Sequence, residues 1–326
     1  MRRREFVALL GGAMVGWPIT ALAQRNPIVI GFLGGQAQPL HGDPQGKAFR
    51  QGLLDYGLVE GRDYVIEDRF AGGDDTRIME FANEFARSKV RIIVANTPAG
   101  VRAAQHLDPP IPVLMTVMND PVGAGLVSSL AHPGNHTSGT ASLNQDLTPK
   151  MLEFVREIIP KANTLAALFN PRNPTSPVMM ENLRANGERT GMTVLPFKLA
   201  PQDDLDALFS ALATRHLDAV QVISDPSIND TRYRLAELAV VHRIPLFSTS
   251  SLFAEAGSLI SYGASVNKIL RRTGYYVKKI MDGVEAGELP VEQPTELELI
   301  VNQKTAAALG LQMPPTLVSL ADEVIE

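Results

Sequence analysis

Short apolar runs alternate with amphipathic helical stretches from residue 28 almost to the end of the chain, and this alternation constrains the fold most strongly. The first run, residues 28–33, contains no charged or polar side chain, as is typical of a strand buried on both faces of a parallel sheet. The stretch that follows places Ala48, Phe49 and Leu53 on one helical face. Strands that alternate with helices form a mostly parallel sheet covered on both faces, so the pattern predicts an α/β fold.

The alternation runs through two halves of the chain. In the first half we expect strands at 27–35, 64–70, 91–95 and 113–117, and helices at 44–56, 76–88 and 98–107. In the second half we expect strands at 164–169, 193–197, 219–223, 246–248, 259–262 and 297–301. The helices of that half are expected at 148–159, 175–190, 203–214, 229–242, 265–282 and 303–309. Two such sheets predict two lobes.

A local echo links the two halves. Residues 111–116 and 244–249 share three identical positions, including the opening Ile-Pro pair, and each segment follows a predicted helix. A structural repeat explains this echo, and so does a loop type in which proline fixes the turn before a strand. Two similar lobes would leave a cleft between them, which is the preferred place for a ligand.

Polar and small residues follow the expected strands in both halves. In parallel sheets, ligands bind beyond the carboxyl ends of the strands, where helix N-termini also present free backbone N–H groups. The candidate ligand-binding residues are Gly35, Gln36, Asn96, Thr97, Pro98, Thr116, Asn119, Asp120, Asn170, Ser224, Asp225, Thr249, Ser250 and Tyr262.

Two kinds of role remain open for the best of these candidates. Asp120 and Asp225 could pair with a ligand ammonium, and Thr97 could help to hold a carboxylate, together with Ser250. The same aspartates and Thr97, and also Ser224, are good helix N-caps, because each is followed within two residues by a proline.

Patterns for metal, cofactor or catalytic chemistry are scarce. The chain has no cysteine, and of its six histidines His132 and His136 are four apart but separated by Pro133 and Gly134. There is no Gly-x-Ser-x-Gly elbow and no P-loop, and the glycines at 31–35 lack the dinucleotide-binding spacing. We therefore expect no metal, no cofactor and no catalytic residues.

The first 23 residues have the pattern of a secretory signal peptide. Three arginines precede an apolar stretch from Val7 to Leu22, and a small-x-small site ends at Ala23. The Arg-Arg pair before Phe6 resembles a twin-arginine signal. We expect cleavage after Ala23 and a periplasmic location; a retained N-terminal helix is the alternative.

The net charge of the chain indicates which classes of binding partner are favoured. The formal net charge is −5, and it becomes −7 once the three arginines and one glutamate of residues 1–23 are removed. An acidic chain of this kind does not favour a nucleic-acid partner, which would need a basic face. We expect a monomer that binds a small molecule.

Several segments resemble the ABC-transporter substrate-binding family that includes tryptophan- and tyrosine-binding receptors. The resemblance lies in residues 95–99, 119–127, 132–139, 168–171, 244–247, 290–292, 302–306 and 308–310. It implies a type I periplasmic-binding fold: two Rossmann-like lobes with parallel-rich sheets joined by crossing strands. The implied lobes are 28–141 plus 264–287, and 142–262 plus 288–326, with crossings near 139–142, 262–263 and 289.

The resemblance also implies a role. The chain would be the periplasmic solute-binding component of an ABC importer, closing on a small polar or aromatic molecule and presenting it to a permease. Amino-acid-binding members tend to have Thr-Asp-Asn where this chain has 224–226, an acid near Ser250 or Ser251, and aspartate in place of Ser265. These departures leave an amino acid as one candidate ligand among several. A ligand-sensing subunit and an enzyme on the same scaffold are the alternative functions.

Overall fold

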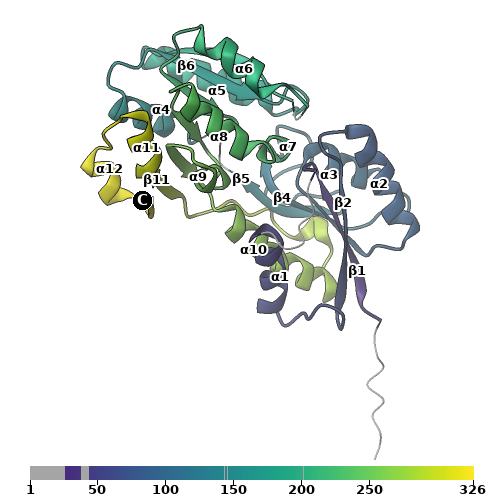
Figure 1. Ribbon diagram of the computed structural model, residues 1–326. Coiled ribbons are helices and arrows are strands. Elements are labelled where there is room, and N and C mark those ends of the chain that lie inside the picture. The colour runs from purple at the N-terminus through teal and green to yellow at the C-terminus, as the bar shows by residue number, and fades with distance from the viewer. Residues whose placement is uncertain (1–25, 38–43, 143, 145, 201) are drawn as a thin grey trace, which may run out of the picture.

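The chain forms two α/β lobes, which lie one above the other in Figure 1. The computed structural model describes residues 26–37, 44–142, 144, 146–200 and 202–326. The predicted signal peptide and its cleavage site lie outside these residues, so both stay predictions. Within the described residues, no helix is long and apolar enough to span a bilayer.

The first lobe is built on a five-stranded parallel sheet of order β2-β1-β3-β4-β5. Its strands are β1 (Ile28–Gly34), β2 (Tyr64–Phe70), β3 (Ile92–Ala95), β4 (Val113–Asn119) and β5 (Thr137–Ser142). Its helices are α1 (Pro44–Asp55), α2 (Asp75–Arg87), α3 (Pro98–Gln105) and α10 (Val266–Met281).

Helices cover both faces of this sheet. Phe49 of α1 and Leu270 of α10 pack with Phe32 on one face, and Phe85 of α2 packs with Ile93 on the other. The strands are apolar on both sides for this reason, as the sequence predicts. The sheet therefore gives the lobe two cores, one on each face.

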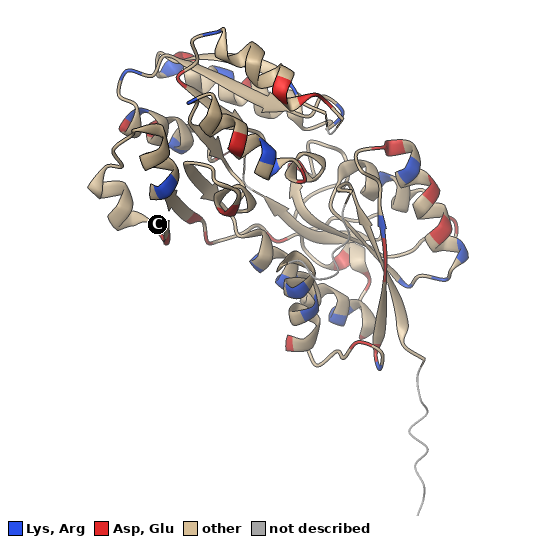
Figure 2. Ribbon diagram, viewed as in Figure 1, with Lys and Arg blue, Asp and Glu red and all other residues tan. Residues whose placement is uncertain are grey.

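The second lobe contains a seven-stranded sheet of order β12-β11-β10-β9-β8-β6-β7. The strands are β6 (Thr164–Phe169), β7 (Thr193–Lys198), β8 (Ala219–Val222), β9 (Leu246–Ser248), β10 (Ile260–Gly263), β11 (Glu298–Asn302) and β12 (Glu323–Ile325). Only the β10–β11 pair is antiparallel. The helices are α4 (Thr148–Ile158), α5 (Ser176–Arg189), α6 (Leu205–Ala213), α7 (Pro226–Asn229), α8 (Arg232–Val241), α9 (Leu252–Ala256), α11 (Gln303–Leu309) and α12 (Pro315–Leu320). Most Lys, Arg, Asp and Glu residues lie on the helices and loops of the two lobes (Figure 2).

Three segments connect the sheets. The chain passes from β5 to α4, from β10 to α10, and from a short 3-10 turn at Ala286–Glu288 to β11. In the third segment, Leu289 and Val291 are buried with residues of the first sheet, and Glu292 pairs with Thr140. The implied lobe boundaries stay a prediction, and these contacts favour an end of the first lobe near Glu292.

One local prediction is wrong, and some elements were not predicted. The stretch 229–242, expected as one helix, contains the end of α7 and then α8, with Asp230 and Thr231 between them. The chain after 309 adds α12 and the edge strand β12, which the sequence pattern did not indicate.

Candidate functional site

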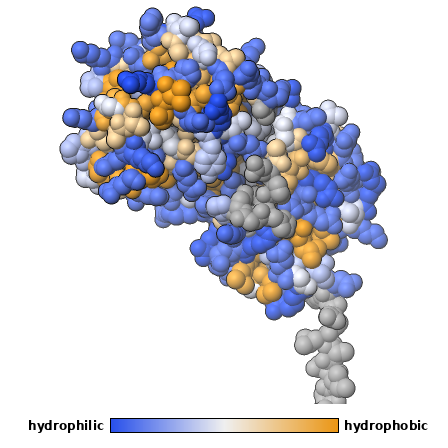
Figure 3. All heavy atoms as spheres, viewed as in Figure 1, coloured by the Kyte–Doolittle hydropathy of each residue, from blue (hydrophilic) through white to orange (hydrophobic). Residues whose placement is uncertain are grey.

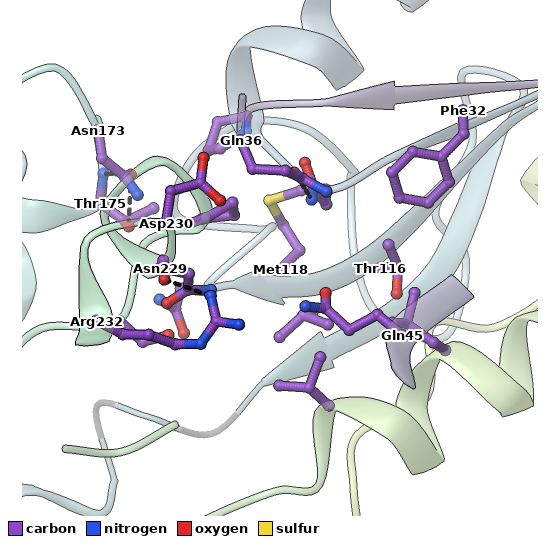
Figure 4. A pocket seen from close by; sticks show the side chains of 18 residues that line it. Phe32, Gln36, Gln45, Thr116, Met118, Asn173, Thr175, Asn229, Asp230 and Arg232 are labelled. Carbon is purple, nitrogen blue, oxygen red and sulfur yellow. Dashed lines mark hydrogen bonds between the residues drawn. The ribbon is translucent and has the colours of Figure 1, made fainter. Parts of the chain in front are cut away.

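The carboxyl ends of the two sheets face a shared cavity. The cavity has a volume of about 90 Å³. The first lobe lines it with residues of β1 and β4, with residues that follow β1 and β3, and with residues of α1 and α10. The second lobe lines it with two residues that precede α5 and with residues around α7 and α8. Figure 4 shows side chains of both lobes pointing into this space.

A bulge in β4 gives the first wall its shape. The pairing of β4 with β5 shifts register between Met115 and Met118, and Val117 has φ +56°. In a regular strand, successive side chains would alternate between the two faces. Here the consecutive residues 116–119 all line the cavity, so the bulge turns a strand end into a continuous wall.

The second wall is held by hydrogen bonds around Asp225. This buried residue caps α7, where its carboxylate accepts hydrogen bonds from the backbone N–H and hydroxyl of Ser227. The same carboxylate accepts from the side-chain amides of Asn170 (3.2 Å) and Asn173 (2.8 Å). Asn173 in turn accepts hydrogen bonds from the backbone and hydroxyl of Thr175, and both residues line the cavity.

A smaller cavity lies beside the larger one and also takes residues from both lobes. It is lined by Gly35, Thr97, Asn170, Arg172 and Asp225, among others. A Cβ added at Gly35 would come within 2.4 Å of the Thr97 side chain and 3.7 Å of Pro226 in the other lobe. Glycine at this position therefore leaves room for the Thr97 side chain of the same lobe, while the distance to Pro226 is an ordinary contact between the lobes.

Polar contacts cross the cleft. The backbone N–H of Ala37 donates to the carboxylate of Asp230 (2.5 Å), and the Arg172 guanidinium donates to the carbonyl of Gly73 (2.9 Å). The Asn119 amide approaches the sulfur of Met179 at 3.4 Å. The lobes are thus in contact over the cavity, which is a closed arrangement.

The fourteen predicted residues fall into three groups. The larger cavity is lined by Gln36, Asn96, Pro98, Thr116, Asn119 and Ser224. The smaller cavity is lined by Gly35, Thr97, Asn170 and Asp225, and also by Pro98. Neither cavity is lined by Asp120, Thr249, Ser250 or Tyr262.

Members of the third group have other surroundings. Asp120 accepts a hydrogen bond from the backbone N–H of Gly123 in the turn after β4. Tyr262 packs edge-on against Phe154, at 5.2 Å between ring centroids. Thr249 and Ser250 are buried, and their hydroxyl oxygens have no partner among the described residues. Of the predicted caps, Thr97 caps α3 and Asp225 caps α7.

Sequence reasoning missed twelve of the eighteen residues that line the larger cavity. The additional polar residues are Gln45, Asn173, Thr175, Asn229, Asp230 and Arg232, and the additional apolar ones are Phe32, Val117, Met118, Pro226, Val266 and Leu270. Most of these residues lie in strands, helices or turns that the pattern assigned to packing. The polar break in the expected helix at 229–242 was the one available signal.

Of the described residues that line the larger cavity, two are charged, Asp230 and Arg232. Burial raises the pKa of the Asp230 carboxyl, although the hydrogen bond from Ala37 and the charge of Arg232 oppose the shift. In the smaller cavity, burial likewise raises the pKa of Asp75, against the effect of Arg172. The described residues contain no cluster of three or more His, Cys, Asp or Glu side chains arranged to hold a metal.

Some polar atoms that line the larger cavity form hydrogen bonds with the protein, and others form none. Thr116 Oγ1, Asn229 Oδ1 and Arg232 Nε are buried without a hydrogen-bond partner among the described residues. Buried polar groups are normally paired with protein, water or a ligand. Unpaired atoms on both walls of one cavity therefore indicate a binding site for a molecule with several polar groups.

Comparison with known proteins gives one family and a set of relatives. Residues 41–325 match the family described as "ABC transporter substrate binding protein". Among curated proteins, the tyrosine-binding protein of Clostridioides difficile (strain R20291) is 27% identical over 271 residues, which are 83% of this chain and 77% of that protein.

Solved structures match over nearly the whole chain. An ABC domain in complex with L-Trp from Streptococcus pneumonia has a TM-score of 0.82 at 22% identity, covering 92% of this chain and 100% of the other. A ligand-free, open substrate-binding protein with adhesive properties from Clostridium difficile has a TM-score of 0.65 at 26% identity, with coverage of 92% and 99%. The predicted fold, with two parallel-rich sheets in a type I periplasmic-binding arrangement, is thereby confirmed.

Proposed function

Because the chain belongs to the family of ABC transporter substrate-binding proteins, we propose that it is the exported solute-binding component of an ABC importer. The family and the relatives named above are solute-binding proteins rather than enzymes. In this role the chain would work in the periplasm, bind one small molecule between its lobes and deliver it to a permease in the inner membrane.

One observation carries this proposal: the larger cavity is lined by both lobes at the carboxyl ends of both sheets. A ligand there touches two walls that separate when the lobes open, so it stabilises the closed form by its contacts with the second wall. A tyrosine-binding relative and a structure with L-Trp support aromatic amino acids as first candidates for the screen.

We also propose that the protein acts as a monomer. The face in Figure 3 is mostly hydrophilic, with separate hydrophobic patches. Large exposed apolar residues such as Val178, Tyr233 and Leu320 lie on different helices or their flanks. Gel filtration with light scattering tests this part of the proposal; a stable dimer at micromolar concentration would contradict it.

Ligand binding should close the lobes and stabilise the fold. We expect a screen of amino acids, small organic acids, purines and sugars to yield a ligand that adds about 2.7 kcal/mol to the free energy of unfolding at 100 times its Kd. Small-angle scattering should show a larger radius without ligand and the dimensions of the present closed structure with it. Equal radii in both states, or turnover of the ligand, would contradict a binding protein of this kind.

A contact across the cleft should contribute to affinity. Replacing Arg172 by alanine removes the hydrogen bond to the Gly73 carbonyl, which exists only when the lobes are closed. An exposed hydrogen bond contributes about 0.5–1.5 kcal/mol, so the Kd measured by calorimetry should rise about 2- to 10-fold. Arg189→Ala is the matched control, because the Arg189 side chain bonds only to Asn186 on its own helix. An unchanged Kd for Arg172→Ala would show that this contact does not support closure.

A further inference from the structure

Among the residues that the structure describes, the Arg232 guanidinium is the only cation that lines the larger cavity, and part of it has no hydrogen-bond partner. Its Nη1 donates to the backbone carbonyl of Asn229 (2.7 Å). Its Nε is buried and has no hydrogen-bond partner among the described residues. In Figure 4 the guanidinium points toward Gln45, which extends from the opposite lobe.

The unused part of this guanidinium has a specific chemistry. With Nη1 bonded to Asn229, the edge formed by Nε and Nη2 remains available, and two parallel N–H groups on one edge match the two oxygens of a carboxylate. The bond to Asn229 also fixes the plane of the group before a ligand arrives. An anionic ligand on this edge would add a charge-assisted pair of hydrogen bonds to a half-buried guanidinium whose Nε has no partner among the described residues.

The rest of the cavity favours an apolar body for this ligand. Phe32, Val117 and Met118 line it from the first sheet, and Val266 and Leu270 line it from α10. Phe32 and Met118 lie across the cavity from Arg232 in Figure 4. A single positive charge opposite an apolar wall matches a molecule with one acidic end and one apolar end.

Several side-chain acceptors of the cavity are already paired with protein donors. The side-chain oxygens of Gln36, Asn96, Asn119 and Asn173 each accept a hydrogen bond from another described residue. The carboxylate of Asp230 accepts the backbone N–H of Ala37 across the cleft. An α-ammonium group carries three N–H donors and needs acceptors that are free. The buried acceptors of the cavity without a partner among the described residues are two neutral oxygens on opposite walls, Thr116 Oγ1 and Asn229 Oδ1, whereas the unused donor of Arg232 is charged.

From this balance we propose that the ligand is a monocarboxylic acid with an apolar or aromatic body and no α-ammonium group, anchored by Arg232. The inference rests on the proposed function, since it concerns the ligand of the same cavity. Arg232 binds the carboxylate through Nε and Nη2, and the body of the ligand packs on Phe32 and the α10 side chains.

Matched pairs of compounds test the ligand class. Calorimetry on the purified chain would compare 3-phenylpropanoate with L-phenylalanine, 3-(4-hydroxyphenyl)propanoate with L-tyrosine, indole-3-propanoate with L-tryptophan, and 4-methylpentanoate with L-leucine. We expect at least one acid to bind about tenfold or more tightly than its amino-acid partner, because only the amino acid leaves ammonium donors unpaired. The neutral amide of that acid should bind about 30-fold or more weakly than the acid, because a charge-assisted pair is lost.

Variants test the anchor. Arg232→Gln should weaken the best acid by about 30- to 100-fold but change binding of its neutral amide by less than about threefold. Arg232→Lys keeps the charge but loses the paired N–H groups, so it should recover only part of the affinity. Arg234→Gln is the control, because Arg234 lies two residues further along α8 and pairs at the surface with Asp206 and Glu237. A structural role for Arg232 would instead weaken the acid and its amide equally.

The outcomes separate this inference from the proposed function. If an amino acid binds more tightly than its matching acid, or if a purine or sugar from the wider screen binds and none of the acids does, the ligand class is wrong and the binding function stands. If an acid binds but Arg232→Gln binds it equally well, the anchor is wrong. If no compound in either set binds or closes the lobes, both proposals fail.

Discussion

Replacing Gly52 by alanine is expected to lower the free energy of unfolding by about 3 kcal/mol, because the added methyl group has no space. Gly52 lies in α1 where this helix crosses α10. An ideal Cβ at this position would lie 1.9 Å from the carbonyl oxygen of Arg271, which is backbone and cannot rotate away. The two helices would have to separate, and Phe49 and Leu53 on the same helix would lose their packing with α10.

A glycine of α10 faces Gly52 at the same helix crossing, so a second variant tests the same close contact. A Cβ at Gly274 of α10 would lie 2.2 Å from the backbone of Gly52. Gly274→Ala should therefore be about as destabilising as Gly52→Ala, and the double variant should lose less than the sum, since the first separation makes room for the second methyl group.

A glycine nearby provides the control. Gly57 has φ +77°, and nothing lies within 4 Å of a Cβ built on it. Gly57→Ala should cost only about 1 kcal/mol, from the left-handed backbone alone. Thermal and urea unfolding followed by circular dichroism would measure all the variants. Similar losses for Gly52→Ala and Gly57→Ala would show that the helix crossing adapts and that the close approach does not limit stability.

The fold was largely accessible from the sequence because its two sheets are buried on both faces. Continuous apolar runs therefore mark the strands, and amphipathic stretches mark the helices between them. The echo between 111–116 and 244–249 has a structural counterpart, since it leads into β4 and β9. The order β2-β1-β3-β4-β5 matches β7-β6-β8-β9-β10, so these two strands hold the same rank in their sheets.

Strand β5 shows where the pattern gives no signal. Residues 137–142 are small or hydroxylated, yet all six are buried beside β4. Their burial depends on the third connecting segment, whose Glu292 exchanges backbone hydrogen bonds with Gly139 and Ala141. A strand buried by a chain segment about 150 positions away has no local apolar signature.

The candidate site was predictable only in part, for a similar reason. Residues such as Asn96 and Ser224 directly follow strands, so the rule of strand ends finds them. Arg232 and Leu270 line the cavity only because the connecting segments orient two lobes and a long helix around it. That orientation is a tertiary property, and the spacing of residues within α8 or α10 does not contain it.

The two aspartates at the strand ends, Asp120 and Asp225, differ in whether their carboxylates hold part of the cavity wall in place. Asp225→Ala is expected to lower the free energy of unfolding by about 3 kcal/mol, because it leaves several buried donors unpaired. Asp225 is 4% exposed, and its carboxylate accepts hydrogen bonds from Asn170, Asn173 and Ser227. The donors of Asn170 and Ser227 are buried, and the loop that carries Asn173 in the cavity wall would lose its bond to the cap of α7.

Asp120→Ala is the matched control for this prediction. The Asp120 carboxylate accepts a hydrogen bond from the backbone N–H of Gly123 in an exposed turn, so its loss should cost about 1 kcal/mol or less. The two variants also separate stability from binding. Thermal unfolding of each variant with and without the best ligand should show a reduced ligand-induced gain for Asp225→Ala, because the wall at Asn173 loosens, and an undiminished gain for Asp120→Ala.

The alternative roles of these aspartates give the opposite pattern. If Asp120 pairs with a ligand ammonium, Asp120→Ala would abolish the ligand-induced gain while hardly changing the stability of the free protein. If Asp225 is only a cap that does not support the wall, its variant would lose stability and keep the full gain. The expected combination, a large loss of stability with a partial loss of binding at Asp225 and neither effect at Asp120, follows from which cavity wall each carboxylate holds in place.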